Sequence, residues 1–406
     1  MHDVIVVGAR CAGSPLAMLL ARKGYRVLVV DKARFPSDAV SSHLIWHAGL
    51  ARAKRWGLLD RILALGAPPI RRVSLDTGDF EFAGSPPPLD GIDYAVAPRR
   101  NVLDKLLVDA AREAGAEIRE GFYVSEIMVE DGRVTGIRGR TAGGEMMTER
   151  AQITVGADGV RSMVASTVRA AKYNTRPSTA CAYYAYWRGG PRVTDFENYV
   201  RPSFGSALLP TNDGLTCLVG GWKEGFAAAG ERPAQTYRRL LHMVSRLSEF
   251  SREAEQVGSV KGIREVPGYF REPCGDGWAL VGDAGYHKHP LSAQGISDAF
   301  RDADLLCDAL DEGFSGGSDM ADALEQYERL RDAAVTPIYQ STCDRARLEP
   351  FSFEALALFR ALRTNQHEAD RFFGTDAGTV PMAEFFAPRN LERIVQSAPS
   401  AAAKSG

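Results

Sequence analysis

The sequence predicts an α/β fold in which a Rossmann-type domain carries an inserted antiparallel β-sheet domain and ends in a helical C-terminus. Three observations lead to this prediction. The chain opens with a buried strand, a glycine turn, a helix and a second strand that ends at Asp31, which together form a βαβ unit. Two later strands also end in glycine turns, at residues 151–162 and 277–285. Residues 176–266 are rich in Tyr, Trp and Phe and alternate in the manner of antiparallel strands.

Local patterns define the individual elements. Residues 3–7 form a β-branched run typical of a buried strand, and residues 99–116 repeat apolar positions with the period of a helix. Residues 117–140 alternate like a meander with a DG hairpin turn. One helix is expected near 233–247 and a long one near 293–312. The expected regions are a discontinuous Rossmann-type domain (1–70, 98–175 and 267–318), a β-sheet domain (71–97 and 176–266), a helical C-terminal region (319–396) and a disordered tail (397–406).

Composition restricts the class of protein. The 406 residues carry 49 Lys+Arg against 51 Asp+Glu, so no basic surface for nucleic acid is expected. The six cysteines form no CxxC and no Cys/His cluster, which argues against a disulfide framework and a metal site and favours a reducing cytoplasm. The N-terminus lacks signal-peptide features, and no apolar run is long enough to span a membrane. The sequence leaves open whether the chain forms a homodimer.

Residues 8–13 read GARCAG, which matches the fingerprint G-x-G-x-x-G at Gly8 and Gly13 but has Arg10 at the middle position. Glycines in this fingerprint permit a tight turn and let pyrophosphate approach backbone N–H groups. Asp31, at the end of the next strand, is placed to hydrogen-bond an adenosine ribose hydroxyl. The context therefore indicates a dinucleotide site. Arg10 either lies over the pyrophosphate, reaches toward the reacting centre, or is a solvated surface residue.

The third glycine turn is followed by a helix start that suits an anionic group. A strand delivers Asp283, Pro290 interrupts the chain, and a helix opens at Gln294, Gly295 and Ile296. Free backbone N–H groups and the positive end of the helix dipole would face whatever lies in front of them. This arrangement suits a group that becomes anionic, such as a reduced flavin at its N1 and C2=O edge.

Together with GADG at 156–159, these motifs resemble those of the FAD-dependent monooxygenase superfamily, which has the glutathione-reductase-like fold of para-hydroxybenzoate hydroxylase. Flavin-dependent halogenases and geranylgeranyl reductases are related to it. The resemblance implies that the Rossmann-type domain binds FAD and that the inserted sheet binds substrate. It also implies NADH or NADPH as a transient reductant, since no second G-x-G-x-x-G follows.

The resemblance also implies an FAD site that draws residues from every motif. Arg100, with Arg99 as the alternative, would lie near the pyrophosphate, and Asp283 would bind the ribityl chain. Asp158 and Gly159 would assist both FAD and the pyridine nucleotide. The residues expected to contact FAD are Gly8, Arg10, Cys11, Ala12, Gly13, Asp31, Lys32, Arg100, Asp158, Gly159, Gly282, Asp283, Pro290, Gln294, Gly295 and Ile296.

Three histidines are candidate catalytic residues. His287 and His289 flank Lys288 after the third glycine turn, where the family's chain passes the isoalloxazine. A histidine there could act as general base for a phenol, or else pack against the ribityl chain. His43, with His47 nearby, belongs to a loop that the family brings near the flavin; alternatively both are ordinary core histidines.

The resemblance implies a single-component, group A FAD monooxygenase. NAD(P)H would reduce FAD, O2 would add at C4a, and the hydroperoxide would oxygenate an aromatic or other apolar ring substrate, in secondary metabolism or degradation. The aromatic strands at 183–187 and 199–204 would floor the substrate pocket, or simply form core.

Three alternatives remain open. A double-bond reductase of the geranylgeranyl reductase type would need no O2. A variant halogenase is disfavoured because W-x-W is absent and residues 66–97 contain no lysine. Only the substitution of Arg10 favours a non-catalytic FAD protein.

Overall fold

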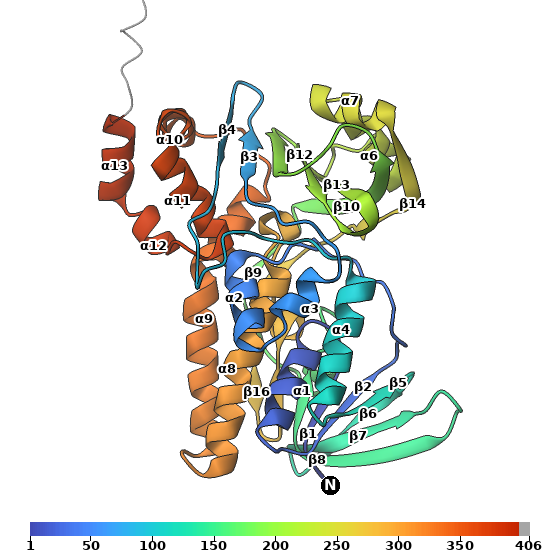
Figure 1. Ribbon diagram of the computed structural model, residues 1–406. Helices are drawn as coiled ribbons and strands as arrows, with labels where there is room; N and C mark the ends of the chain where they lie inside the picture. Colours follow the sequence, from blue (N-terminus) through green and yellow to red (C-terminus); the bar gives the residue numbers. More distant parts are fainter. Residues whose placement is uncertain (398–406) are drawn as a thin grey trace, which may run out of the picture.

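The computed structural model describes residues 1–397, and its first sheet collects the parallel strands (Figure 1). The strand order is β16–β17–β8–β1–β2–β5. The strands are β1 (His2–Val7), β2 (Val27–Asp31), β5 (Glu117–Glu120), β8 (Met146–Gly156), β16 (Cys274–Gly275) and β17 (Trp278–Leu280). All neighbours except the β16–β17 pair run parallel. The carboxyl ends of β1, β2, β8 and β17 therefore lie at one edge, where ligands bind in open α/β sheets.

A hairpin extends this sheet on one side. β6 (Tyr123–Glu130) and β7 (Arg133–Arg140) turn at Asp131 and Gly132, both with positive φ, as the DG signal predicts. β7 pairs with the first half of β8. The expected meander was wrong at its start: β5 pairs in parallel with β2, because the chain reaches it through a helix in a βαβ crossover.

Helices cover the parallel strands and form the main core with them. Its central helices are α1 (Gly13–Arg22), α4 (Arg100–Glu113) and α8 (Gly295–Ser315). Leu16, Leu103 and Phe300, one from each helix, are fully buried in this core. Additional helices are α2 (His47–Arg55), α3 (Leu59–Leu63), α5 (Met163–Thr167) and α9 (Met320–Arg345), which packs along α8 (Figure 1).

A second sheet of seven strands is largely antiparallel and has the order β14–β10–β13–β12–β11–β3–β4. Its strands are β3 (Val73–Asp76), β4 (Glu81–Gly84), β10 (Ala180–Gly189), β11 (Phe196–Arg201), β12 (Phe204–Pro210), β13 (Leu215–Lys223) and β14 (Ala254–Ile263). The expected helix at 233–247 is instead two helices, α6 (Pro233–Leu241) and α7 (Ser245–Glu253), because Val244 between them is extended. With the two sheets and the C-terminal helices in place, the predicted fold class is confirmed; the domain boundaries stay a prediction.

Two smaller units complete the chain. A three-stranded sheet of β9 (Lys172–Arg176), β15 (Gly268–Arg271) and β18 (Tyr286–His287) lies where the chain passes between the large sheets. The C-terminal helices α10 (Phe353–Thr364), α11 (Gln366–Ala377), α12 (Met382–Phe385) and α13 (Pro388–Gln396) share a core with the seven-stranded sheet. The predicted disordered tail lies, from residue 398 on, outside the described residues. Within residues 1–397, no helix combines the length and apolar character that crossing a bilayer requires.

Candidate active site

The glycine turns after β1, β8 and β17 pack against one another at the carboxyl edge of the parallel sheet. Gly8 has a φ of +107°, and a Cβ there would lie 2.4 Å from the Ala157 carbonyl oxygen. A Cβ on Gly13 would lie 1.9 Å from the Gly8 carbonyl oxygen, and one on Gly282 would lie 2.9 Å from the Ala12 Cβ. Any side chain at these positions would push the turns apart, so the glycines are sterically required.

Asp31 at the end of β2 is held by backbone N–H groups. Its Oδ2 accepts a hydrogen bond from the Ala9 N–H and its Oδ1 accepts one from the Ala33 N–H, both at 2.8 Å. Each carboxylate oxygen has a second acceptor position. Asp31 is therefore fixed beside the first glycine turn and can accept a further hydrogen bond from a hydroxyl group.

Two arginines beside the first turn share one buried carboxylate. Arg100, the first residue of α4, donates to both oxygens of Asp104 at 2.9 and 3.1 Å. Arg10 donates to the same carboxylate at 2.5 Å and to the Ser37 hydroxyl at 2.9 Å. Asp104 is fully buried, so it balances one of the two positive charges and orients both guanidinium groups.

Two residues near these arginines, Cys11 and Arg99, were also candidates for contacts with FAD. The Cys11 thiol donates to Asp104 at 3.3 Å, and burial raises its pKa well above the usual range, so Cys11 is a neutral thiol. Arg99, the alternative to Arg100, instead pairs with Asp213 at 2.6 Å and does not line the cavity described below. Sequence reasoning missed Asp104, although it lies four residues after Arg100, at i,i+4 helical spacing.

The turn after β8 presents a buried carboxylate and an open backbone. Asp158 accepts a hydrogen bond from the Met163 N–H at 2.6 Å through Oδ2, whereas Oδ1 is buried without a partner among the described residues. Burial raises the pKa of Asp158. Gly159 has a φ of +77°, and a Cβ there would meet nothing within 4 Å. An unsatisfied buried acceptor next to open space indicates a ligand position.

The N-terminus of α8 faces the same space. The first intrahelical bond runs from the Asp298 N–H to the Gln294 carbonyl at 2.9 Å, so the N–H groups before it are not used within the helix. A Cβ on Gly295 would meet nothing within 4 Å. Gln294 donates to the Asp376 carbonyl at 2.8 Å, and its Oε1 is buried without a partner among residues 1–397. These donors can stabilise negative charge in front of the helix.

The histidines predicted after the third turn both line the cavity. His287 hydrogen-bonds the Pro267 carbonyl oxygen through Nδ1 at 2.7 Å. His289 accepts a hydrogen bond from the Leu291 N–H at 3.2 Å through Nδ1, and burial lowers its pKa to about 4. A neutral ring with an accepting Nδ1 carries its proton on Nε2. This Nε2 is buried and unpartnered within the described residues, so His289 is an available hydrogen-bond donor.

His43 and His47 lie outside the cavity wall. His43 is fully buried, its Nε2 lies 2.7 Å from the Tyr186 hydroxyl, and its ring packs edge-on against Tyr184, which does line the cavity. Burial lowers the pKa of His43 to about 3 and that of His47 to about 4. His43 therefore packs behind the wall, against Tyr184 and beside Ser41, and does not line the cavity itself.

Lys288 is a buried cation in the cavity wall. Its Nζ pairs with the Asp298 carboxylate, whose other oxygen accepts from Arg301 at 2.9 Å. Arg301 also donates to the Tyr286 hydroxyl and to Asp302, each at 2.8 Å. The Lys288 ammonium is thus fixed within a charge network at the start of α8.

The three glycine turns, Asp31, the two arginines Arg10 and Arg100, and the start of α8 line one cavity of about 1170 Å³. All the residues expected to contact FAD lie in its wall except Gly13, which is buried beneath Gly8, and so do His287 and His289. Single-ligand pockets span roughly 300–1,000 Å³, so this cavity has room for more than one molecule. Its wall continues from the glycine turns into the space between the seven-stranded sheet and the C-terminal helices.

The cavity has a near half, beside the glycine turns and the start of α8, and a far half, between the seven-stranded sheet and the C-terminal helices. The far half is apolar. The seven-stranded sheet contributes a floor of Val73, Leu75, Phe196, Ala207, Leu209 and Val219. The C-terminal segment contributes a roof of Phe351, Leu358, Phe359, Phe372, Phe373 and Phe386. Of the aromatic residues in the two strands expected to floor the pocket, Tyr183 and Tyr184 line the cavity, whereas Trp187, Tyr199 and Phe204 pack in a separate core. The sequence did not predict the roof, although seven of the chain's 18 phenylalanines fall within residues 351–386. An apolar, aromatic chamber suits an apolar or aromatic ligand.

Asn198 places a polar side chain on this floor. The Asn198 side-chain N–H2 group donates to the Ser74 carbonyl at 3.1 Å and to the Phe196 carbonyl at 3.3 Å. These two acceptors fix the orientation of the amide, because its oxygen cannot replace a donor. The amide Oδ1 is hydrogen-bonded to no residue in the described part of the chain, and Asn198 lines the cavity. The floor therefore offers one acceptor in an apolar setting.

The donor and acceptor set of the near half fits FAD. The required glycines leave the backbone open to a pyrophosphate, two arginines add positive charge, and Asp31 and Asp158 keep acceptors free for hydroxyl groups. The unused N–H groups of α8 suit the N1 and C2=O edge of a flavin. Fold and site thus define an FAD-binding α/β flavoprotein.

Comparison with known proteins agrees. The chain belongs to the family described as FAD binding domain, whose model matches residues 1–342, and is an FAD-dependent oxidoreductase of that family. A kynurenine 3-monooxygenase of Salinispora arenicola is 30% identical over 359 residues, covering 81% of this chain and 76% of that protein. A digeranylgeranylglycerophospholipid reductase of Methanocella arvoryzae is 27% identical over 351 residues, covering 82% and 83%.

A solved structure shares the architecture. The flavin-dependent brominase Bmp2 superposes with a TM-score of 0.80 at 19% identity, covering 97% of this chain and 98% of that one. At this identity the likeness concerns the fold, since one fold hosts many reactions.

Proposed function

We propose that this chain is an FAD-dependent monooxygenase that uses NADH or NADPH and O2 to oxygenate an apolar aromatic ring compound. The observation that carries the proposal is the single cavity, which runs from the FAD motifs into an apolar aromatic chamber. Such a cavity holds a substrate directly against the flavin end of the site. The kynurenine 3-monooxygenase similarity, which extends over most of both chains, supports the same chemistry.

Reduced FAD, once bound, supplies the electrons that activate O2, so that one oxygen atom enters the substrate and the other leaves as water. The chain's own contribution is binding and electrostatics. The free N–H groups at the start of α8 stabilise negative charge in the near half. Aromatic side chains of the roof exclude water from the far half, which protects reactive intermediates from hydrolysis.

The floor also indicates what the substrate carries. Because Asn198 Oδ1 is an acceptor without a protein donor, a hydroxyl or N–H group on the ring would satisfy it. A ring that lacks such a donor would leave the amide oxygen desolvated and unpaired. We therefore expect a phenol or an aromatic amine rather than a plain hydrocarbon.

The test uses the FAD-loaded protein. NADH or NADPH added without O2 should bleach the flavin absorbance, and O2 added afterwards should restore it. With a substrate present, isotopically labelled O2 should place one labelled atom in the product, as mass spectrometry would show. If phenols and aromatic amines stimulate NAD(P)H oxidation and every electron equivalent ends as hydrogen peroxide, the monooxygenase assignment fails.

A double-bond reductase is the second candidate, and the reductase similarity favours it. The apolar chamber would also accept an isoprenoid chain, which is as apolar as an aromatic ring. Such an enzyme consumes reductant without O2. Anaerobic oxidation of reduced flavin by a polyprenyl substrate, with loss of a double bond, would support this candidate over the monooxygenase.

A halogenase is less consistent with the site. Two features favour it: the fold shared with the brominase and the buried Lys288 in the cavity wall. The Lys288 ammonium is paired with Asp298, however, and is not free to bind an oxidised halide. A chloride- or bromide-dependent product would reverse this ranking.

A further inference from the structure

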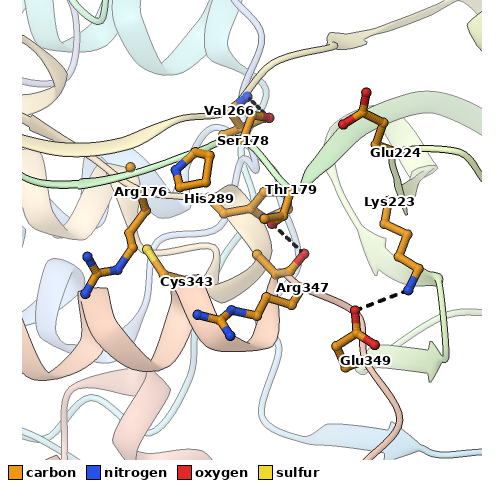
Figure 2. Close-up of a pocket in the computed structure, with 13 residues that line it drawn as sticks. Arg176, Ser178, Thr179, Lys223, Glu224, Val266, His289, Cys343, Arg347 and Glu349 are labelled. Atoms are coloured by element: carbon orange, nitrogen blue, oxygen red, sulfur yellow. Dashed lines mark hydrogen bonds and ion pairs between the residues drawn. The ribbon is translucent and has the colours of Figure 1, made fainter.

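A second, smaller cavity lies behind the wall of the main one. It has a volume of about 480 Å³ and lies between the ends of β9, β13 and α9 (Figure 2). His289, Val266 and Glu349 line both cavities. The small cavity, called here the side cavity, therefore adjoins the main one at these three residues.

The side cavity has a cationic end. Arg176 donates only to the Thr175 carbonyl within the described residues, at 3.3 Å, and the nearest carboxylate to Arg347 is Asp344 at 3.5 Å. Figure 2 shows both guanidinium groups on the same side of the cavity. A guanidinium has five N–H donors, so most donors of this pair are free. Two solvent-exposed arginines with unused donors at one end of a cavity suit phosphate oxygens.

The opposite end of the side cavity is neutral or acidic. Lys223 pairs with Glu349 at 3.2 Å, so their charges cancel. Glu224 lies beside them, on the other side of the cavity from the arginines (Figure 2). A ligand here therefore carries its negative charge at one end only.

His289 supplies a buried donor between the two cavities. Its Nδ1 is occupied by the Leu291 N–H, and its Nε2 is buried and has no acceptor within residues 1–397. A buried N–H without an acceptor is rare in proteins and indicates a position where a ligand supplies the acceptor. A carbonyl oxygen of a passing molecule would satisfy it.

We propose that the side cavity binds the phosphate-bearing part of the nicotinamide dinucleotide, with Arg176 and Arg347 on phosphate oxygens and the nicotinamide amide passing His289. The proposal rests on the proposed function, because that function requires a dinucleotide reductant. The sequence holds one βαβ fingerprint, at residues 8–13, which we assign to FAD, so the reductant needs another place. The side cavity adjoins the main one and has the required charge.

Binding is measured on the FAD-loaded, oxidised protein by calorimetric titration with NAD+, NADP+ and inorganic pyrophosphate. These probes do not reduce the flavin, so binding is separated from turnover. The variant Arg176→Gln/Arg347→Gln should weaken dinucleotide and pyrophosphate binding about tenfold or more, since each arginine makes charge-assisted hydrogen bonds. Arg192→Gln, which removes an exposed arginine between β10 and β11, is the matched control and should bind like the wild type.

Two results overturn the site: a wild type that binds none of the three probes, or a double variant whose affinities lie within about twofold of the wild type. The passage is tested by His289→Phe, which should keep pyrophosphate affinity but slow the anaerobic bleaching of flavin by NAD(P)H. Unchanged bleaching would place the nicotinamide route elsewhere and overturn that part of the proposal.

The outcomes separate the site from the proposed function. Weakened dinucleotide binding in the double variant, together with no oxygenated product from the wild type, would support the site and reject the monooxygenase. Unchanged binding with a labelled product would reject the site and support the monooxygenase.

Discussion

The two halves of the main cavity are built from different parts of the chain. In the near half the shape of the wall is set largely by backbone, namely the required glycines and the N–H groups at the start of α8, to which charged side chains such as Arg10 and Arg100 are added. In the far half the wall is side chains, which come from the seven-stranded sheet and from helices α10 to α12. A backbone wall tolerates few substitutions, whereas a wall of side chains can change its shape without changing the fold. Such a division allows proteins that share one fold to differ in the molecules they bind.

The largest effect is expected from a substitution that disrupts the glycine turns of the near half. In Gly8→Ala, the new Cβ would meet the Ala157 carbonyl at 2.4 Å in a backbone with positive φ. We expect a loss of FAD binding and a decrease in the free energy of unfolding of about 3 kcal/mol or more. Flavin absorbance per protein measures the FAD content, and thermal unfolding measures the loss of stability.

Gly24→Ala is the matched control for this variant. Gly24 also has positive φ, +94°, but a Cβ there meets nothing within 4 Å. It should cost about 1 kcal/mol and leave FAD bound. Equal flavin loss in both variants would show that strain, not the contact between the turns, governs the site.

The next effect concerns the far half alone. Phe359→Ala removes a buried ring from the roof, and we expect a decrease in the free energy of unfolding of about 3 kcal/mol together with weaker substrate binding. FAD content should remain that of the wild type. Phe353→Ala, at the exposed start of the same helix, should change stability by less than about 0.5 kcal/mol. Loss of FAD from Phe359→Ala would contradict the separation of the halves.

A pH effect is expected where the halves meet, at His43. Burial lowers the pKa of His43 from 6.5 to about 3, so only the unfolded chain takes up this proton as the pH falls below 6.5. The contribution to stability is therefore present above pH 6.5 and is lost toward pH 3, at about 1.4 kcal/mol per pH unit. Urea unfolding of wild type and His43→Gln at several pH values should show a flatter dependence in the variant. Parallel curves would mean that His43 is not the group responsible.

The smallest expected effect concerns which ligands the far half distinguishes. Asn198→Leu removes the acceptor on the floor, and we expect about tenfold weaker binding of a phenol but not of its methyl ether. Thr216→Val is the control, because Thr216 belongs to the same sheet, on β13, but does not line the cavity. It should leave both affinities unchanged. Equal losses for the phenol and the ether in Asn198→Leu would indicate a change of shape rather than a lost hydrogen bond.

The near half was predictable because its signals are local. A glycine turn between a strand and a helix sets its own geometry, and Asp31 and Gly295 follow directly from the elements that carry them. Fifteen of the sixteen residues expected to contact FAD line the cavity, and their contact with FAD stays a prediction. His43 was expected near the flavin, but the structure places Tyr184 in the wall and packs His43 against it.

The far half was not predictable because it depends on contacts between distant segments. The roof residues look like any amphipathic helix until α10 and α11 pack over the sheet. Asp104 acquires its role only when Arg10, distant in sequence, meets it in space. The break between α6 and α7 likewise depends on the extended backbone at Val244, within a segment whose helical pattern continues.

The charge network at the start of α8 affects the electrostatic potential of the cavity. An acidic residue in the first turn, such as Asp298, ordinarily screens the positive end of a helix. Here Lys288 and Arg301 neutralise that carboxylate from the side, so the helix presents an unscreened positive potential to the cavity. Any bound molecule that exists in neutral and anionic forms is shifted toward the anion there. The protein thus favours an electron-rich state of its ligand without placing a free cation against it.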